Sequence, residues 1–344
     1  MINLKFFVLI PVYKTEEFIS KCIDSVLSQS YQNFHIVIVD DGSPDRAGEI
    51  ADSYAYKDHR ISVIHKENQG LISARRAAID YVNTNYCCEN DYFVFLDSDD
   101  TLQDNALSVI YECLCREKFD MVFFGLQRVH NGKVLFSVDN DPFVGVIEDK
   151  RELYRRVFFN SVYNPLCRKA IRCALVKSED YSAFYHINTA EDLLQSIPIY
   201  RDCCKVAFVS DLLYNYSVNP ASITECIDCN KYRIDSTVRR EVWDFLCKQN
   251  VFSEGDLSEY LQYCRRLLRS EIIQIALFKL PYNKIRMLFQ DIKKDRYYRM
   301  LLNGSKDYVL FFLKCGIYTA FVVPLRCRRA LNSLRSYISK KNRR

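Results

Sequence analysis

Short apolar runs alternate with helical patterns between residues 6 and 96, and this alternation limits the folds open to the chain. Four runs are too short and too apolar for amphipathic helices and are predicted to be buried strands: 6–11, 34–39, 61–65 and 92–96. Three helices are predicted between them, at 12–27, 46–56 and 71–83. Strands that alternate with helices indicate an α/β fold with a parallel sheet, which binds ligands outside the carboxyl ends of its strands.

Acidic and amide side chains stand near the ends of three of these strands. Asp40 follows the second strand, Asn68 the third and Asp97 the fourth. A parallel sheet brings such positions to one crevice. In Asp97-Ser98-Asp99, two carboxylates one residue apart suit Mg²⁺ or Mn²⁺, cations that usually sit between carboxylates and a substrate diphosphate. A short acidic run alone more often marks a solvated turn, so the metal prediction depends on the neighbouring motifs.

Six sequence blocks together resemble the family 2 glycosyltransferases, which are inverting, nucleotide-sugar-dependent enzymes with the GT-A fold. The blocks follow the order seen in that family: 7–13, 39–45, 68–75, 97–100, 191–194 and 214–224. The resemblance implies a Rossmann-like domain with a mostly parallel central sheet flanked by helices. It also implies a nucleotide-sugar donor, with UDP as the expected nucleotide.

The resemblance implies a donor pocket along the strand ends. In this reading Asp40 accepts the ring N–H of the base, a donor that an ionised carboxylate suits. Asp41 is expected to brace the turn through backbone amides. Arg75 is expected to reach the ribose or the diphosphate, the alternative being a surface arginine. The full expected set is Pro11, Tyr13, Glu16, Asp40, Asn68, Gly70, Arg75, Asp97 and Ser98.

The resemblance also implies a divalent cation and a catalytic base. Asp97 and Asp99 are expected to hold Mn²⁺ or Mg²⁺, which would neutralise the UDP leaving group. Asp100 offers a third carboxylate, and the sequence leaves open which two contact the metal most closely. Asp192 is expected to take the proton from the acceptor hydroxyl as it attacks the sugar. Its neighbour Glu191 is expected to point elsewhere, and the alternative for Asp192 is a helix-dipole role.

Two positions depart from the family pattern. Many relatives carry Ala-Arg-Asn where this chain has Ala74-Arg75-Arg76, and many carry an arginine where it has Ser217. The second change removes a cation near the expected diphosphate site. It puts the details of phosphate binding in doubt rather than the class of reaction.

Four segments are predicted along the chain. A catalytic domain is expected at 1–228, with a nucleotide-sugar half at 1–102 and an acceptor half at 103–228. A helical extension is expected at 229–305, because long helical patterns cover 231–248 and 256–277. The segment 306–344 is an apolar stretch followed by a polybasic tail.

Cysteine usage favours an intracellular protein. Fifteen cysteines are an odd number, and residues 1–12 are expected to begin a core strand rather than a secretory signal. Reduced cysteines that act as small core hydrophobes fit best. A zinc site at Cys226-x-x-Cys229 has little support, because no second pair accompanies it.

The end of the chain combines apolar and basic residues. The sixteen residues 308–323 are largely apolar, but a spanning helix needs about twenty. Eight Lys and Arg residues lie in the last twenty positions, and no acidic residue follows Asp307. This pattern predicts peripheral attachment to an anionic membrane surface, on the cytoplasmic side. The alternatives are a buried helix with a solvated tail, or a nucleic-acid partner, for which no groove-reading motif is present.

The function predicted from these features is inverting transfer of a sugar from a nucleotide-sugar. The donor is expected to be a UDP-hexose or UDP-N-acetylhexosamine, and the acceptor a hydroxyl of a growing glycan or lipid-linked oligosaccharide. A nucleotidyltransferase would need a glycine-rich, basic phosphate loop after the first strand, and residues 12–15 do not supply one. The alternative from another class is a catalytically silent, membrane-associated nucleotide- or glycan-binding protein.

Overall fold

The computed structural model describes residues 3–86, 89–130, 133–138, 144–177, 179–219, 231–278 and 280–329. The chain divides into two compact units, Met1–Cys226 and Ile227–Arg344. The predicted boundary at 228, the second half of the last motif block and Cys226-x-x-Cys229 all lie outside the described residues. No described cysteine forms a disulfide.

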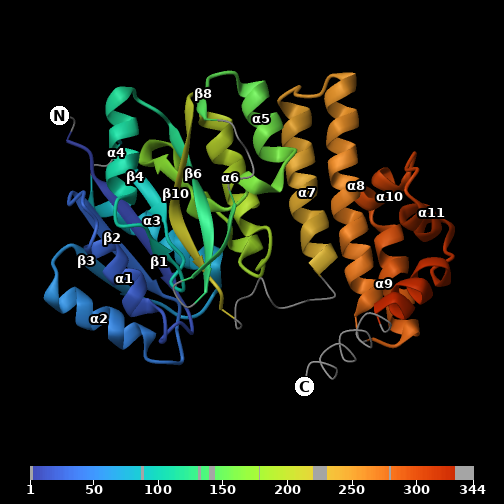
Figure 1. Ribbon diagram of the computed structural model, residues 1–344, viewed down its shortest axis with the longest axis horizontal. Helices are drawn as coiled ribbons and strands as arrows, with labels where there is room; N and C mark the ends of the chain where they lie inside the picture. Colours follow the sequence, from blue (N-terminus) through green and yellow to red (C-terminus); the bar gives the residue numbers. More distant parts are fainter. Residues whose placement is uncertain are drawn as a thin grey trace. The chain divides into compact units, whose positions relative to one another are not determined.

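Ten strands of the described residues form one sheet in the first unit (Figure 1). The main order is β3-β2-β1-β4-β9-β6-β10-β5, with β7 added to β6 and β8 to β10. The strands are β1 Phe6–Val12, β2 Phe34–Asp40, β3 Ile61–His65, β4 Tyr92–Phe95, β5 Thr101–Leu102, β6 Met121–His130, β7 Lys133–Val138, β8 Gly145–Ile147, β9 Lys169–Arg172 and β10 Val206–Ser217.

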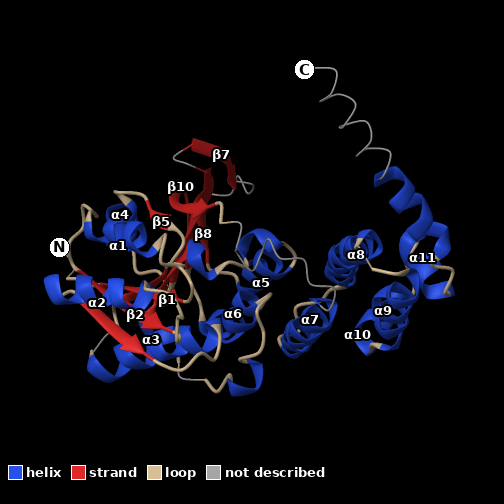
Figure 2. Ribbon diagram, turned by 90° about the horizontal axis from the view of Figure 1, so that it is seen from below, coloured by secondary structure: helices blue, strands red, loops and turns tan. Residues whose placement is uncertain are grey.

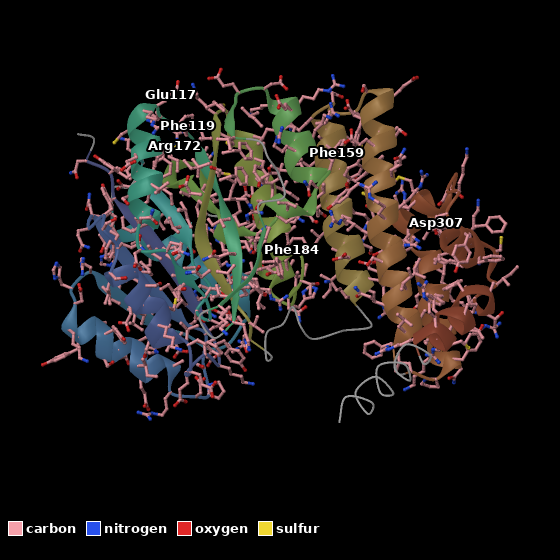
Figure 3. The ribbon with its side chains drawn as sticks, viewed as in Figure 1. Glu117, Phe119, Phe159, Arg172, Phe184 and Asp307 are labelled. Atoms are coloured by element: carbon pink, nitrogen blue, oxygen red, sulfur yellow. The ribbon has the colours of Figure 1, made fainter. Side chains whose placement is uncertain are left out.

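The four strands predicted from the sequence are β1 to β4, and they pair in parallel as expected. The other half of the sheet is mixed. β9 is antiparallel to both of its neighbours, whereas β6 and β10 are parallel to each other. At the start of β6, Asp120 pairs with Arg172 at 2.6 Å; Figure 3 labels Arg172 close to Phe119.

Pro11 ends the pairing of the two central strands just before the site. The β1–β4 register stops at Leu9 and Phe95, and the amide of Leu96 donates to the carbonyl of Leu9. The next β1 amide to face β4 would be that of residue 11, and proline has no amide hydrogen. The carboxyl ends of β1 and β4 therefore separate where the acidic segment 97–100 begins.

Helices cover both faces of the sheet in the first unit (Figure 2). Buried residues of α1, α2 and α4 share one core with Phe6, Val8 and Ile10 of β1. α3 packs against β1 and β2, on the other side of the sheet from α1 and α4 (Figure 2). The helices of this unit are α1 Ile19–Leu27, α2 Ala47–Lys57, α3 Leu71–Asn85, α4 Ala106–Arg116, α5 Lys150–Phe158 and α6 Glu191–Asp202.

The first helix begins later than predicted. Residues 13–18 form a turn, and α1 starts at Ile19. Lys14 adopts a left-handed φ of 57°, and its amide donates to Ser43 Oγ at 2.7 Å. The amide of Glu16 donates to Asp45 at 3.0 Å. These bonds to the loop after β2 offer the backbone an alternative to helical pairing, so the helix cannot begin at residues 12–16.

The second unit is helical where it is described. Its helices are α7 Lys231–Lys248, α8 Glu254–Leu277, α9 Tyr282–Lys294, α10 Arg296–Leu302 and α11 Tyr308–Cys315, and residues 319–329 are also helical. The two long helical patterns predicted at 231–248 and 256–277 correspond to α7 and α8. Ser253 and Asp256 form a reciprocal capping box that starts α8.

The apolar segment 308–323 is partly buried in this unit. Asp307, labelled in Figure 3, caps α11 by accepting hydrogen bonds from the amides of Val309 and Leu310. Gly316 then ends α11 in a left-handed conformation, with φ 80°. Six residues of the segment are almost fully buried: Val309, Leu310, Leu313, Tyr318, Phe321 and Val322. In the described part of the chain, no helix is both long enough and apolar enough to cross a membrane.

Candidate active site

The acidic segment after β4 contains carboxylates of two kinds. Asp100 is 1% exposed, and both of its oxygens are engaged. Oδ2 accepts from the hydroxyl of Tyr214 at 2.6 Å, and Oδ1 accepts from the amide of Ser217 at 2.7 Å. The same Tyr214 hydroxyl accepts the amide of Asp97 at 3.2 Å. Asp100 therefore ties the segment to the end of β10.

Asp97 and Asp99 each keep one oxygen available. Oδ1 of Asp97 accepts from Arg75 at 3.1 Å, and Oδ2 of Asp99 accepts from the Asn219 amide at 2.9 Å. The second oxygen of each carboxylate accepts no hydrogen bond from the described residues. Ser98, between them, is buried.

Electrostatics separate these carboxylates further. Burial, and then the charges of Asp99 and Asp97, raise the pKa of Asp100 well above its usual value. Burial also raises the pKa of Asp97; Arg75 opposes the shift, and the carboxylates of Asp192 and Asp99 add to it. A group of carboxylates that repel one another in a partly desolvated place is a donor set that a cation would stabilise.

The described residues do not form a complete metal cage. Among them, no group of three or more His, Cys, Asp and Glu side chains is arranged to hold a metal ion. Asp97 and Asp99 nevertheless fit Mg²⁺ or Mn²⁺, because these ions are commonly bound by one or two carboxylates while water and substrate phosphates complete the shell.

Asp192 lies in the first turn of α6, with its side chain 21% exposed. Its Oδ1 contacts Nη1 of Arg75, and its Oδ2 accepts from the amide of Leu166 at 3.2 Å. The two residues before Leu166 are held by Lys169, which is fully buried. The ammonium of Lys169 donates to the carbonyls of Asn164 and Pro165, both at 3.0 Å, and burial lowers its pKa to about 7. The carboxylate of Asp192 is therefore held at both oxygens.

Glu191 stands next to the predicted base and differs from it in environment. Burial, and then the charge of Asp192, raise the pKa of Glu191 to about 7. Ala190, which precedes it, adopts a left-handed φ of 59° at the start of α6. Glu191 therefore holds its proton more tightly than an ordinary glutamate.

Arg75 is buried between two carboxylates of the site. Its side chain is 1% exposed, so the alternative of a surface arginine is wrong. Both Nη atoms contact carboxylates, one of Asp97 and one of Asp192. Burial opposes its charge, but these carboxylates, Asp192 first, outweigh that effect and raise the pKa of Arg75. Arg75 therefore connects the segment after β4 with α6.

Asp40, the carboxylate expected to bind the nucleotide base, already has protein partners. Asp40 is 8% exposed. Its Oδ1 accepts the amide of Ser43 at 2.9 Å, and its Oδ2 lies 2.9 Å from Nδ1 of His65. Hydrogen bonds that the protonated ring donates to the carboxylates of Asp40 and then Asp52 raise the pKa of His65. A carboxylate has capacity for further acceptance, so these bonds orient Asp40 without filling its lone pairs.

Asp41 braces backbone amides, as predicted, but in a neighbouring loop. Its carboxylate accepts the amides of Gln69 at 3.1 Å and Gly70 at 2.8 Å, and pairs with Lys66 at 2.5 Å. Gly70 has φ 94°, and a Cβ there would lie 2.8 Å from the carbonyl oxygen of Tyr185. A side chain at residue 70 would therefore push away the loop that leads to α6.

The remaining expected donor residues line the same edge of the sheet. Pro11 is buried at the end of β1, whereas Tyr13 is 43% exposed and presents its ring to solvent. The carboxylate of Glu16 accepts a hydrogen bond from the amide of Arg46 at 3.1 Å. This bond links the turn after β1 to the turn before α2. Asn68 is exposed after β3.

The two departures from the family pattern have structural partners. Arg76 donates to the carbonyl of Lys177 at 2.9 Å and to Asp80 at 3.2 Å, so it braces the segment near residue 177. Ser217 contributes its amide to Asp100 rather than a cation to the site. Asn219, which the sequence analysis did not select, contacts Asp99; its separation in sequence left no local signal by which to find it.

Comparison with known proteins identifies the family. Residues 7–176 match the family model described as Glycosyl transferase family 2. The chain belongs to glycosyltransferase family 2. The uncharacterized glycosyltransferase EpsJ of Bacillus subtilis (strain 168) is 31% identical over 226 residues, which make up 63% of this chain and 62% of EpsJ. The family and its relatives are glycosyltransferases, a class of transferase enzymes.

Two further relatives extend over more of this family 2 chain. The poly(ribitol-phosphate) beta-glucosyltransferase of Bacillus spizizenii is 22% identical over 321 residues, which cover 83% of this chain and 48% of that protein. Crystal structures of residues 1–349 of S. aureus TarS, one in complex with UDP, cover 96% of this chain and 92% of TarS 1–349, with TM-score 0.67 and 17% identity. Another holds UDP-GlcNAc. This likeness shows the shared GT-A fold with a helical C-terminal region.

Proposed function

We propose that this family 2 chain is an inverting, metal-dependent glycosyltransferase with a UDP-sugar donor. The expected donors are a UDP-hexose and a UDP-N-acetylhexosamine, and the acceptor is a hydroxyl of a growing glycan or lipid-linked oligosaccharide. The observation that carries the proposal is the meeting of Asp97 and Asp192 on one buried arginine, with Asp99 beside them. This arrangement supports a metal site and a general base at one end of the sheet.

Asp97 and Asp99 would hold Mn²⁺ or Mg²⁺ through the oxygens that accept no hydrogen bond from the described residues. The bound cation would neutralise the negative charge that develops on the UDP leaving group. Asp100 is left out of this role in the proposal, because it is only 1% exposed and both of its oxygens accept hydrogen bonds inside the protein.

Asp192 would act as the general base. As the acceptor hydroxyl attacks C1 of the sugar, its proton passes to the carboxylate of Asp192 and the bond from C1 to the UDP oxygen breaks with its electron pair. One displacement inverts the anomeric centre, so no nucleophilic side chain is needed. The hydrogen bonds from Arg75 and the Leu166 amide orient the carboxylate for this transfer.

The donor would bind along the ends of β1 to β4. Asp40 would accept the uracil N–H, the exposed ring of Tyr13 would cover the base, and Pro11 would line the pocket. Glu16, Asn68, Gly70 and Ser98 complete the proposed lining. The UDP and UDP-GlcNAc complexes of TarS support a UDP-sugar, and the poly(ribitol-phosphate) beta-glucosyltransferase supports a polymeric acceptor.

The direct test is release of nucleotide from a panel of nucleotide-sugars by the purified chain. With Mn²⁺ or Mg²⁺ we expect slow release of UDP from one donor, and with EDTA we expect none. Metal-dependent UDP binding without release would mean that turnover needs the true acceptor. If no nucleotide binds with or without metal, the proposal fails and the catalytically silent binding protein becomes the better account.

We also propose peripheral attachment of the second unit to an anionic membrane, on the cytoplasmic side. Tyr308, Phe311 and Ile317 remain 49%, 52% and 50% exposed beside the buried face of the apolar segment. The ring of Phe312 contacts those of both Tyr308 and Phe311, so the three rings form one aromatic cluster. Lys306 and Lys314 are exposed nearby in the sequence. Aromatic side chains flanked by cations suit the boundary between lipid headgroups and acyl chains.

Part of the basic tail has another use. Arg326 donates to the carbonyls of Ala276, Phe278 and Leu280 at the end of α8, and Arg329 donates to that of Leu277. Their charges complement the negative end of the helix. Arg326 and Arg329 are therefore engaged within the second unit, so fewer than the eight basic residues of the tail are left to contact lipid headgroups.

Vesicle sedimentation tests the attachment. The full chain should bind vesicles that contain phosphatidylserine and should not bind purely zwitterionic ones. Phe311→Ser should weaken binding by about tenfold, because it removes the burial of one aromatic side chain. Tyr56→Ser, at a 93% exposed residue of the first unit, is the matched control. Equal binding of Phe311→Ser and the wild type would contradict the proposed surface.

A further inference from the structure

Arg75 joins the two halves of the proposed site through one buried side chain. Its Nη2 donates to Asp97 after β4 at 3.1 Å, and its Nη1 donates to Asp192 in α6. The side chain is 1% exposed. All of its donors therefore face protein, and two of them face the carboxylates with proposed roles in metal binding and proton transfer.

We propose that Arg75 is a positioning residue that fixes the general base Asp192 relative to the metal ligand Asp97. This inference rests on the proposed function and deepens it. A guanidinium is planar and presents its donors in a rigid fork, so two carboxylates bound to its two ends keep a set separation. The attacking hydroxyl must lie between the base and the sugar held by the metal–diphosphate, and this separation therefore determines its alignment.

The surroundings hold both carboxylates in place. Oδ2 of Asp192 accepts the amide of Leu166, so the carboxylate cannot rotate away from Arg75. The amide of Asp97 is held by the hydroxyl of Tyr214. The carboxylate of Asp192 therefore has a second anchor besides Arg75, and the backbone that carries Asp97 is fixed by Tyr214. A loss of the shared anchor would loosen the base and the metal ligand together.

Geometry and charge are separable at this position. Lysine keeps the positive charge but is a compact point charge on a flexible stem, and it cannot reproduce a two-ended fork. Arg75→Lys should therefore disturb the mutual placement of Asp97 and Asp192 while it still opposes their negative charge. Arg76→Lys is the matched control, because Arg76 is the next residue of the same helix and is also buried, with partners Lys177 and Asp80.

The experiment combines UDP binding, turnover and a double-mutant cycle on the full chain. The melting temperature first establishes that each variant is folded. Calorimetry with UDP and Mn²⁺ should then give an affinity for Arg75→Lys within about fivefold of the wild type. Its kcat should fall about 100-fold, the cost expected of an ångström-scale misplacement. The double variant with Asp192→Asn should lie within about threefold of Asp192→Asn alone, because both changes disable one unit.

Several outcomes would overturn the inference. If UDP affinity falls as far as kcat and the two substitutions multiply, Arg75 acts on the diphosphate and not on the base. If Arg75→Lys keeps the kcat of the wild type, Arg75 does not position the base. If Arg75→Lys does not fold, Arg75→Gln takes its place, since its amide can hold one carboxylate but not both. A wild type without metal-dependent turnover would instead overturn the proposed function, and the inference with it.

Discussion

Asp192→Asn is expected to reduce sugar transfer by about 100- to 10,000-fold while UDP binding in Mn²⁺ stays close to that of the wild type. The range is that of a positioned general base. Asparagine has nearly the same shape, and its carbonyl oxygen can still accept a hydrogen bond from either Arg75 or the amide of Leu166. The substitution therefore removes proton acceptance, and because the side chain of Asp192 is 21% exposed, water can satisfy the donor that faces the new amide nitrogen. Turnover and calorimetric UDP affinity are the two measurements.

The control for this variant is Asp104→Asn, because Asp104 is an exposed carboxylate close to the acidic segment. It should keep full transfer. If Asp192→Asn retains more than about a tenth of wild-type turnover, the base is elsewhere, and Glu191 is the next candidate. Burial and the charge of Asp192 raise the pKa of Glu191 to about 7. If Glu191 were the base, activity would therefore fall as the pH drops through about 7, because its carboxylate becomes protonated.

Asp99→Asn is expected to remove metal-dependent UDP binding and to lower transfer by at least about 100-fold. A metal that stabilises charge in a transition state contributes several kcal/mol, and about 1.4 kcal/mol corresponds to a factor of ten in rate. Asn219 already holds one oxygen of Asp99, so the other is the proposed ligand. EDTA should reproduce the effect in the wild type and should have little further effect in the variant.

Asp100→Asn gives the contrasting result that makes this prediction specific. Both oxygens of Asp100 accept hydrogen bonds inside the protein. Asparagine would replace one acceptor oxygen by an NH2 group that faces a protein donor and leaves that donor unsatisfied, which costs about 1–3 kcal/mol of the free energy of unfolding. Denaturant unfolding should therefore detect Asp100→Asn, while its metal affinity per folded molecule should change little. Normal UDP affinity in EDTA, together with normal transfer by Asp99→Asn, would contradict the metal proposal.

Local patterns in the sequence were sufficient for the first half of the sheet and for the long helices. The runs at 6–11, 34–39, 61–65 and 92–96 are strands, because an apolar run of this length has few alternatives to burial in a sheet. The helices at 231–248 and 254–277 follow from apolar periodicity in the same way. The motif blocks indicated the family, which the match over residues 7–176 confirms.

The contacts of the site were decided by tertiary structure. The sequence analysis expected Arg75 to face the donor, and nothing local to residue 75 reveals that Asp97 and Asp192 close over it. Nor could it separate Asp99 from Asp100, because the partners that distinguish them, Tyr214 and Asn219, come from the distant end of β10 and the loop after it. The apolar segment 308–323 likewise divides into buried and exposed faces only through packing of the second unit. Periodicity and motif order are properties of neighbouring residues, whereas hydrogen-bond partners and burial are set by residues that only folding brings together.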